Sequence, residues 1–260
     1  MARSPRPVPR SLEVLRCAPF TRNMLRVTLG GEALADFPQE QEGGYIKLRL
    51  PPLPGTEKPI VRTYTIRSQR GEGAAMELDI DFALHGTGGR DAGPATEWAM
   101  AAEAGEVVMV AGPGPAKPLP PGASRYLVAG DMAALPAIGV NLERLDRQAR
   151  GSVVIEIQHE EDRQPIDHPP GIELHWLVNP EPGQRSDLLP AHLRSLGWEE
   201  GTYAWAACEF SAMRALRSYL LEERGLGRDA LYISSYWKSG LTEDSHKVVK
   251  REDAEARGEA

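Results

Sequence analysis

The alternation of apolar and polar residues in the first part of the chain predicts β-structure. Between about residues 11 and 112, short runs rich in β-formers are separated by Gly and Pro turns. They predict strands at 12–20, 24–31, 44–50, 61–68, 76–85 and 106–113. Strands at this spacing are typical of an antiparallel barrel or sandwich. One helix is expected over 93–105, where Ala-rich helix formers follow Pro94, with Gly93 or Thr96 near its cap.

The pattern changes after a Pro- and Gly-rich segment at 111–124, which we interpret as a linker. Predicted helices at 135–149 and 211–225 then alternate with strands at 125–131, 151–160, 172–178, 202–209 and 230–237. This alternation indicates a parallel sheet with crossover helices. The charged residues 241–260 are compatible with a helix. We therefore predict a β barrel plus α/β fold: an antiparallel barrel domain at 11–116, a parallel-sheet domain at 123–238 and a helical tail at 239–260.

Composition narrows the classes of function. The 260 residues carry a formal net charge of −7, which argues against a broad nucleic-acid surface because such binding neutralises phosphates. Cys17 and Cys208 are the two cysteines and form no CxxC motif, so neither a disulfide framework nor a zinc site is predicted. No run approaches the roughly 18 apolar residues of a membrane span, and the basic start lacks a signal-peptide core. We expect a cytoplasmic monomer without nucleic-acid or membrane partners.

The run "VRTYTIRS" at 61–68 places a cation beside an aromatic ring. Strand alternation puts Arg62 and Tyr64 on one face and Thr63 and Thr65 on the other. On spacing alone, a solvated strand face is the commoner interpretation. The alternative is a dinucleotide such as FAD, because arginine suits a phosphate and tyrosine offers a flat ring.

Two turns are further candidates. The glycine-rich residues 86–93 lead into the predicted helix near Pro94, whose N–H groups and the Thr96 hydroxyl suit a pyrophosphate. Gly130 and Asp131 join a predicted strand to a helix, which is where parallel sheets bind ligands, although GxGxxG is absent. His85 ends a strand without the spacing of a catalytic or metal site, so we expect an ordinary histidine there. We expect Cys208 to be a small buried residue.

The ordered set "YIKLRL", "VRTYTIRS", "DIDFALHG", "GPATEWA", "AGDMAALPAI" and "YWKSGLTED" resembles the siderophore-interacting protein family. These are flavin-dependent ferric-siderophore reductases of the ferredoxin–NADP reductase-like superfamily. The resemblance implies that Arg62 lies at the FAD pyrophosphate, Tyr64 against the isoalloxazine and Thr65 near its N5 edge. The other FAD contacts that it implies are Asp81, His85, Gly93, Ala95 and Thr96.

The same resemblance implies that electrons pass from NADH, NADPH or reduced ferredoxin through FAD to a ferric siderophore, releasing Fe(II). The flavin would carry the chemistry, so no catalytic side chain and no protein metal ligand are expected. Gly130 and Asp131 would approach the nicotinamide nucleotide, and acidic residues in 156–162 favour NADH, although Arg163 could compensate. An anionic catecholate siderophore would require cations; the candidates are Lys47, Lys117 and Lys238.

The chain also departs from the family pattern. Met132-Ala133 stand where a Glu-Thr pair is common, and Cys208 replaces a glycine, so nicotinamide binding is the least supported function. Two alternatives stay open. One is a generic NAD(P)H:flavin or ferredoxin reductase, and the other is a non-enzymatic siderophore-binding flavoprotein.

Overall fold

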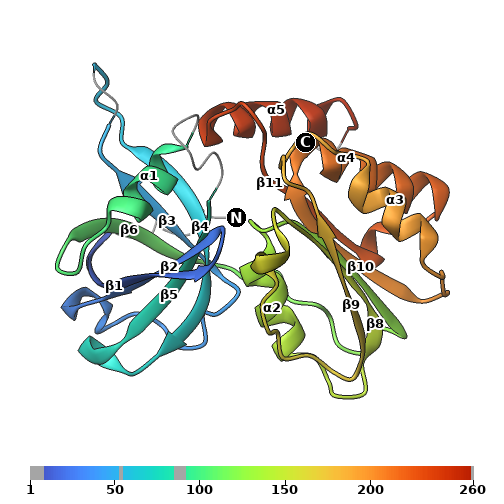
Figure 1. The fold of residues 1–260 in the computed structure, drawn as a ribbon, viewed down its shortest axis with the longest axis horizontal. Helices are drawn as coiled ribbons and strands as arrows, with labels where there is room; N and C mark the ends of the chain where they lie inside the picture. Colours follow the sequence, from blue (N-terminus) through green and yellow to red (C-terminus); the bar gives the residue numbers. More distant parts are fainter. Residues whose placement is uncertain (1–8, 53–54, 85–91, 259–260) are drawn as a thin grey trace. The chain divides into compact units, whose positions relative to one another are not determined.

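The computed structural model describes residues 9–52, 55–84 and 92–258, and the chain forms two compact units (Figure 1). Unit 1 extends to Pro118 and unit 2 begins at Leu119. Strand structure continues to Gly114. The first four residues of the expected linker, 111–114, are therefore part of a strand, and the prediction of a linker beginning at 111 was wrong.

Unit 1 is a closed barrel with the strand order β1-β2-β5-β4-β3-β6, and all its strand pairs are antiparallel. The predicted antiparallel barrel is confirmed. Its strands are β1 (Arg10–Thr21), β2 (Met24–Gly30), β3 (Tyr45–Leu50), β4 (Ile60–Arg70), β5 (Glu77–Ala83) and β6 (Val107–Gly114).

The barrel core follows from the two-residue period of the strands. In β3 the side chains of Ile46, Leu48 and Leu50 are buried, whereas Lys47 between them is exposed. The neighbouring strands contribute the same kind of alternating apolar residues to one cluster. This alternation is why the hydrophobic pattern was sufficient to locate the strands.

Helix α1 (Pro94–Ala101) accompanies the barrel and begins as expected, with Gly93 as its N-cap and Pro94 in the first turn. Gly93 is the cap, and Thr96 lies in the first turn of the helix and is buried. The helix ends at Ala101, earlier than predicted. Ala95 and Ala99 face the barrel core, which fixes this helix against the wall.

Unit 2 contains a five-stranded parallel sheet in the order β11-β10-β7-β8-β9, which confirms the predicted α/β class. The strands are β7 (Arg125–Gly130), β8 (Arg150–Ile157), β9 (Gly171–Val178), β10 (Thr202–Glu209) and β11 (Leu231–Trp237). The helices are α2 (Leu135–Glu143), α3 (Leu188–Ser195), α4 (Phe210–Ser218) and α5 (Glu243–Glu255).

The helices of unit 2 differ from the prediction in three places. One is α4, which ends at Ser218, short of the expected 225, and continues as a π-helix at Tyr219–Glu223. Helix α2 ends at Glu143, short of the expected 149, and α3 was not predicted. Helix α3 is short and contains a proline, but it buries Leu189 and Leu193 against the sheet. Packing rather than local propensity therefore accounts for it.

Strand β10 is the centre of unit 2. Residues 204–208 are buried along both faces of the strand, including Trp205, as expected for a parallel sheet covered on both sides. Helix α5 docks beside β11, where Ser235 and the His246 ring lie 2.8 Å apart and Lys250 donates to Ser234 over 2.7 Å. In the described part of the chain, every helix is too short or too polar to span a membrane.

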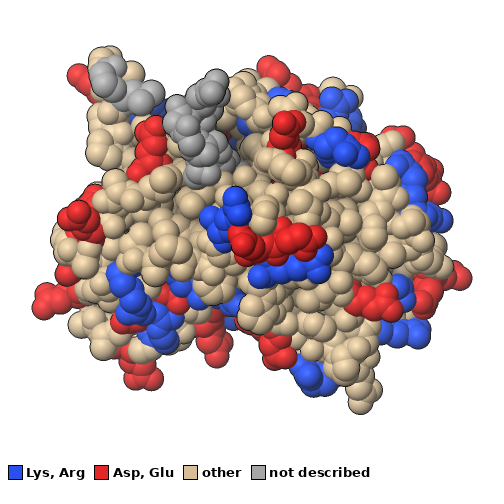
Figure 2. Space-filling model, viewed as in Figure 1, with Lys and Arg blue, Asp and Glu red and all other residues tan. Residues whose placement is uncertain are grey.

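The visible surface carries charges of both signs. Figure 2 shows acidic and basic side chains interspersed over that face, without a broad basic area. This distribution agrees with the net charge of −7.

Candidate functional site

The register of β3 and β4 defines the face that carries Arg62 and Tyr64. Arg62 lies opposite Leu48 and Tyr64 opposite Ile46, two residues whose side chains are fully buried. Thr63 lies opposite the exposed Lys47. Arg62 and Tyr64 therefore share the barrel-facing side of β4, as the alternation predicted.

Tyr64 begins a row of three aromatic rings. Its ring centroid is 4.2 Å from that of Phe82 on β5, and Phe82 is 5.8 Å from Trp98 on α1. Phe82 is buried, whereas Tyr64 and Trp98 are partly exposed. The ring row connects the candidate flavin contact on β4 to the helix predicted to hold the diphosphate.

Arg62 is available for an anion in the described structure. Its guanidinium donates one hydrogen bond, from Nη1 to the Val61 carbonyl oxygen at 2.9 Å, and pairs with no carboxylate of the described residues. A guanidinium has five N–H donors, so most of its capacity remains. Thr65 is half-buried on the opposite face, beside Tyr45 of β3.

The N-terminus of α1 has the character of an anion site. Gly93 provides no side-chain cap, so the helix's first N–H groups receive no hydrogen bond from a cap side chain. Ala95 and Thr96 are buried at this end. His85 and residues 86–91 lie outside the described residues, so the predicted glycine-rich loop stays a prediction.

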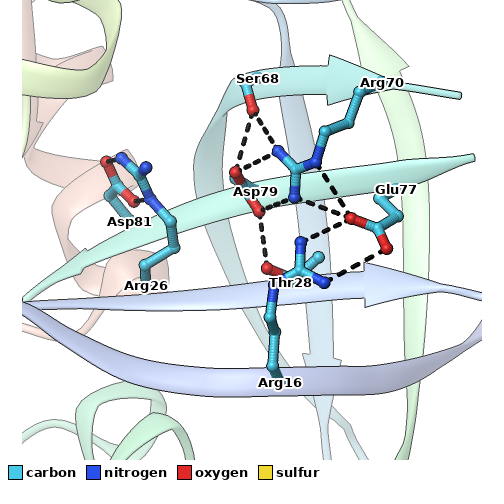
Figure 3. A network of polar contacts seen from close by, with 8 residues as sticks. All are labelled: Arg16, Arg26, Thr28, Ser68, Arg70, Glu77, Asp79 and Asp81. Carbon is cyan, nitrogen blue, oxygen red and sulfur yellow. Dashed lines mark hydrogen bonds and ion pairs between the residues drawn. The ribbon is translucent and has the colours of Figure 1, made fainter.

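Asp81 points away from this face. Its neighbours Ile80 and Phe82 belong to the barrel core, and its carboxylate forms a two-pronged ion pair with Arg26 at 2.6 and 2.8 Å (Figure 3). The Arg26 guanidinium also lies 4.0 Å from the centre of the Phe20 ring. The structure does not bring Asp81 to Tyr64, and its role as an FAD contact stays a prediction.

The outer wall of the barrel holds a polar network centred on Asp79 (Figure 3). Asp79 is 4% exposed and accepts hydrogen bonds from Thr28 at 2.6 Å, Ser68 at 3.0 Å and Arg70 at 2.5 and 2.8 Å. Glu77 joins Arg70 to Arg16. Burial would raise the pKa of Asp79, but the hydrogen bonds and the Arg70 charge outweigh it and lower the pKa to about 2.

In unit 2, Asp131 occupies the carboxyl edge of the parallel sheet directly after β7. Its Oδ2 accepts from the Glu209 backbone N–H at 2.8 Å and from Trp237 Nε1 at 2.7 Å, and its Oδ1 accepts from the Ala133 N–H at 3.0 Å. Burial raises the pKa of Asp131 to about 6, although these hydrogen bonds oppose the shift. The carboxylate thus links three segments that are distant in sequence.

Two more acids at this edge, Glu156 and Glu209, are buried, which the sequence interpretation did not predict. Glu156, near the end of β8, accepts from Asn179 Nδ2 at 2.8 Å, and burial, with the charges of Asp131 and Glu209, raises its pKa to about 7. Glu209 ends β10 and caps α4 through Ser211 and Ala212. In the sequence, Glu209 ends the predicted strand 202–209, whereas Glu156 lies inside the predicted strand 151–160. Cys208 is fully buried, as expected, and burial raises its thiol pKa.

The candidate substrate lysines are distributed over both units. Lys47 and Lys117 are exposed on unit 1. Lys238 follows β11 in unit 2, with its Nζ 4.7 Å from the centre of the Phe210 ring. Within residues 9–52, 55–84 and 92–258, no three His, Cys, Asp or Glu side chains are grouped to hold a metal ion.

Comparisons with known proteins identify the family of each part of the chain. The siderophore-interacting FAD-binding domain family matches residues 52–117, and the siderophore-interacting protein family matches residues 123–240. The ferric vibriobactin reductase of Vibrio cholerae is 36% identical over 257 residues, or 92% of each chain.

Solved structures give the same result. The siderophore-interacting protein SipS of Aeromonas hydrophila has a TM-score of 0.82 and 33% identity, covering 96% of this chain and 99% of its own. A siderophore utilization protein from T. fusca has a TM-score of 0.78 and 30% identity, with coverage of 90% and 94%. From this identity and coverage, the chain belongs to the siderophore-interacting protein family.

Proposed function

We propose that this protein is an FAD-dependent ferric-siderophore reductase. The observation that carries the proposal is the near full-length similarity to a protein named ferric vibriobactin reductase, together with the Arg62–Tyr64 face on a barrel matched by an FAD-binding family. A reductase of this kind requires a bound flavin and cations for an anionic ferric chelate. The candidates are Arg62 and Tyr64 for the flavin and Lys47, Lys117 and Lys238 for the chelate.

The residues of unit 1 fit FAD by their chemistry. Arg62 has unused donors for a diphosphate, α1 begins without a side-chain cap, and Tyr64 is a half-buried ring supported by Phe82. When bound, the flavin accepts two electrons together and releases them singly, which suits one-electron reduction of iron(III). The chain's own task is to hold the cofactor and orient its ring. Arg62 and the α1 N–H groups would hold the diphosphate, and Tyr64 would pack against the isoalloxazine.

The substrate is a ferric siderophore, and we assign it to the catecholate class because such chelates are anionic. Lys47, Lys117 and Lys238 supply cations toward it. Reduction to iron(II) weakens binding by hard oxygen ligands, so the metal is released. Both cysteines are free thiols, which is in keeping with the cytoplasm, where we place the protein as a monomer.

We expect Lys47→Ala and Lys238→Ala each to weaken binding of a ferric tris-catecholate by several-fold. The loss should be larger at low salt, where charges are least screened. Flavin content and melting temperature should change little, because Lys47 is exposed and exposed charges contribute little stability. Titration of each variant at two ionic strengths measures the effect.

Lys58→Ala, at an exposed position before β4, is the matched control. Unchanged affinity in both lysine variants would remove these side chains from the substrate site. A large loss of flavin or stability would instead assign them to the fold.

The electron donor is tested by the rate of flavin reduction. The segment after β8 contains Glu160, Glu161 and Asp162, and Arg163 already pairs with Glu160 at 2.6 Å. A 2′-phosphate there would meet net negative charge, so we expect NADH to reduce the flavin several-fold faster than NADPH. Reduced ferredoxin is the third donor to compare. Stopped-flow absorbance of the flavin measures all three, and faster reduction by NADPH would contradict the assignment.

The same instrument separates the alternative functions. Reoxidation of the reduced flavin by a ferric siderophore is expected for the proposed enzyme. Rapid reduction by a nucleotide without acceleration of reoxidation would indicate a generic flavin reductase. Siderophore binding with no flavin reduction by any donor would indicate a binding protein.

A further inference from the structure

The segment Trp237–Ser239, which presents Lys238, is held on both sides by buried carboxylates. On one side, the Trp237 indole Nε1 donates to Asp131 Oδ2 at 2.7 Å. On the other, the Ser239 backbone N–H donates to Glu209 Oε1 at 3.3 Å. Asp131 and Glu209 are 6% and 4% exposed.

The two carboxylates are themselves connected. Asp131 Oδ2 also accepts from the backbone N–H of Glu209, at 2.8 Å. This contact is possible because β7, β10 and β11 are neighbours in the sheet and their carboxyl ends meet at one edge. An irregularity in the β10–β11 pairing after Cys208 sets Glu209 opposite Trp237 rather than Tyr236. The same local shift therefore brings Trp237 into the reach of Asp131.

Gly183 and Phe210 also pack against the segment. Gly183 lies so close that a Cβ there would be 2.9 Å from Ser239 Cβ and 3.3 Å from the Trp237 ring. Gly183 also has φ +83°, which favours glycine. The Lys238 ammonium lies over Phe210, the first residue of the helix that Glu209 caps. Lys238 thus projects from a segment whose two neighbours are both fixed.

We propose that Asp131 is a positioning residue, which fixes Trp237 so that the adjacent Lys238 is presented to the anionic ferric chelate. Glu209 supports the same segment through Ser239. This inference rests on the proposed function, in which Lys238 contacts the substrate. It gives Asp131 a role beyond approach to a nicotinamide, because both its carboxylate oxygens accept hydrogen bonds from the chain itself.

The arrangement costs stability. Since burial raises the pKa of Asp131 to about 6, the folded chain holds this carboxylate ionised at pH 7 against a desolvation penalty. An ionised carboxylate can accept hydrogen bonds at both oxygens, as this position requires, whereas an amide has only one accepting oxygen.

The test uses Trp237→Phe, which keeps a ring but removes the indole donor, and Asp131→Asn as a second variant. Affinity is measured by titrating the flavin-loaded protein with a gallium(III) tris-catecholate, which is not reduced. We expect each variant to bind about three- to tenfold more weakly, as for loss of a buried hydrogen bond. With the ferric chelate, KM should rise while kcat at saturation stays unchanged. Trp176→Phe, on β9 of the same sheet, is the control and should bind like the parent protein.

Double variants identify the path of the effect. If Asp131 acts through Trp237 and Lys238, then the double variant Asp131→Asn/Trp237→Phe should bind the chelate as weakly as Trp237→Phe alone. Likewise, adding either substitution to Lys238→Ala should not weaken chelate binding further. Parent-like affinity in Trp237→Phe and Asp131→Asn, with weakened affinity in Lys238→Ala, would overturn the positioning role and leave the proposed function intact. Parent-like affinity in Lys238→Ala would overturn both this inference and the substrate role of Lys238, whereas flavin reduction and reoxidation would still test the reductase itself.

Discussion

Arg62→Ala is expected to lower FAD affinity by tenfold or more. A hydrogen bond to a charged group contributes about 1.5 to 3 kcal/mol, which corresponds to about ten- to 150-fold in affinity. In the described structure Arg62 has no carboxylate partner whose loss would disturb the barrel, so the melting temperature of the flavin-free protein should hardly change. Flavin content after purification and fluorescence titration with FAD measure the effect.

Arg49→Ala is the matched control for this substitution. Arg49 lies on β3 opposite Val61, on the other face of the barrel wall from Arg62. Its removal should leave the flavin in place. Equal flavin loss in both variants would show that the barrel-facing side of β4 is not the flavin face. A parent protein that takes up no FAD would remove the whole functional proposal.

Asp79→Asn is expected to reduce the free energy of unfolding by about 2 kcal/mol at pH 7. The substitution removes the charge that Arg70 neutralises while it keeps the size of the side chain. Thr28 and Ser68 also lose an ionised acceptor. This loss is smaller than the roughly 3 to 5 kcal/mol for breaking a fully buried ion pair, because the Arg70 side chain is 42% exposed. Urea unfolding of the two proteins measures the difference.

The pH dependence gives a second check on Asp79. Its pKa is about 2 in the folded protein and about 3.9 in an unfolded chain, so the folded state binds its proton less readily. The stabilisation is complete above about pH 4 and is lost as the pH falls through about 2. The stability difference between parent and Asp79→Asn should shrink over that window. Asp36→Asn, which removes a largely exposed partner of Arg10, should have little effect at any pH.

The secondary structure could be predicted from the sequence wherever buried and exposed side chains alternate along a strand. Ile46, Lys47 and Leu48 show why: each successive side chain of a strand points to the opposite face, so the pattern of hydrophobicity reports the barrel wall directly. Helix α3 was missed because Leu189 and Leu193 gain their stability from contact with the sheet. Helix α2 was predicted to be too long because the polar residues 144–149, which follow it, have a composition typical of helices.

Among the candidate flavin residues, too, the sequence predicted some positions and not others. Strand alternation predicted that Arg62 and Tyr64 share one face, which the register confirms, whereas their assignment to the flavin came from the family resemblance. Asp81, in the separate motif "DIDFALHG", was expected as an FAD contact through the family resemblance, yet its carboxylate pairs with Arg26 on the outer wall. A short sequence motif records which residues are present, but not the partner that a neighbouring strand supplies.

The sequence by itself determined the barrel, the parallel sheet and the family, because these depend on periodicity and on an ordered set of local motifs. Only the tertiary structure decided which charged groups meet. Asp131 lies 78 residues before Glu209 and 106 residues before Trp237 along the chain. The three residues touch because three parallel strands end at one edge of the sheet. Asp79 gains its network in the same way, from strands that the barrel brings together. Hydrogen bonding and burial act through space, so their partners follow from sheet order and register.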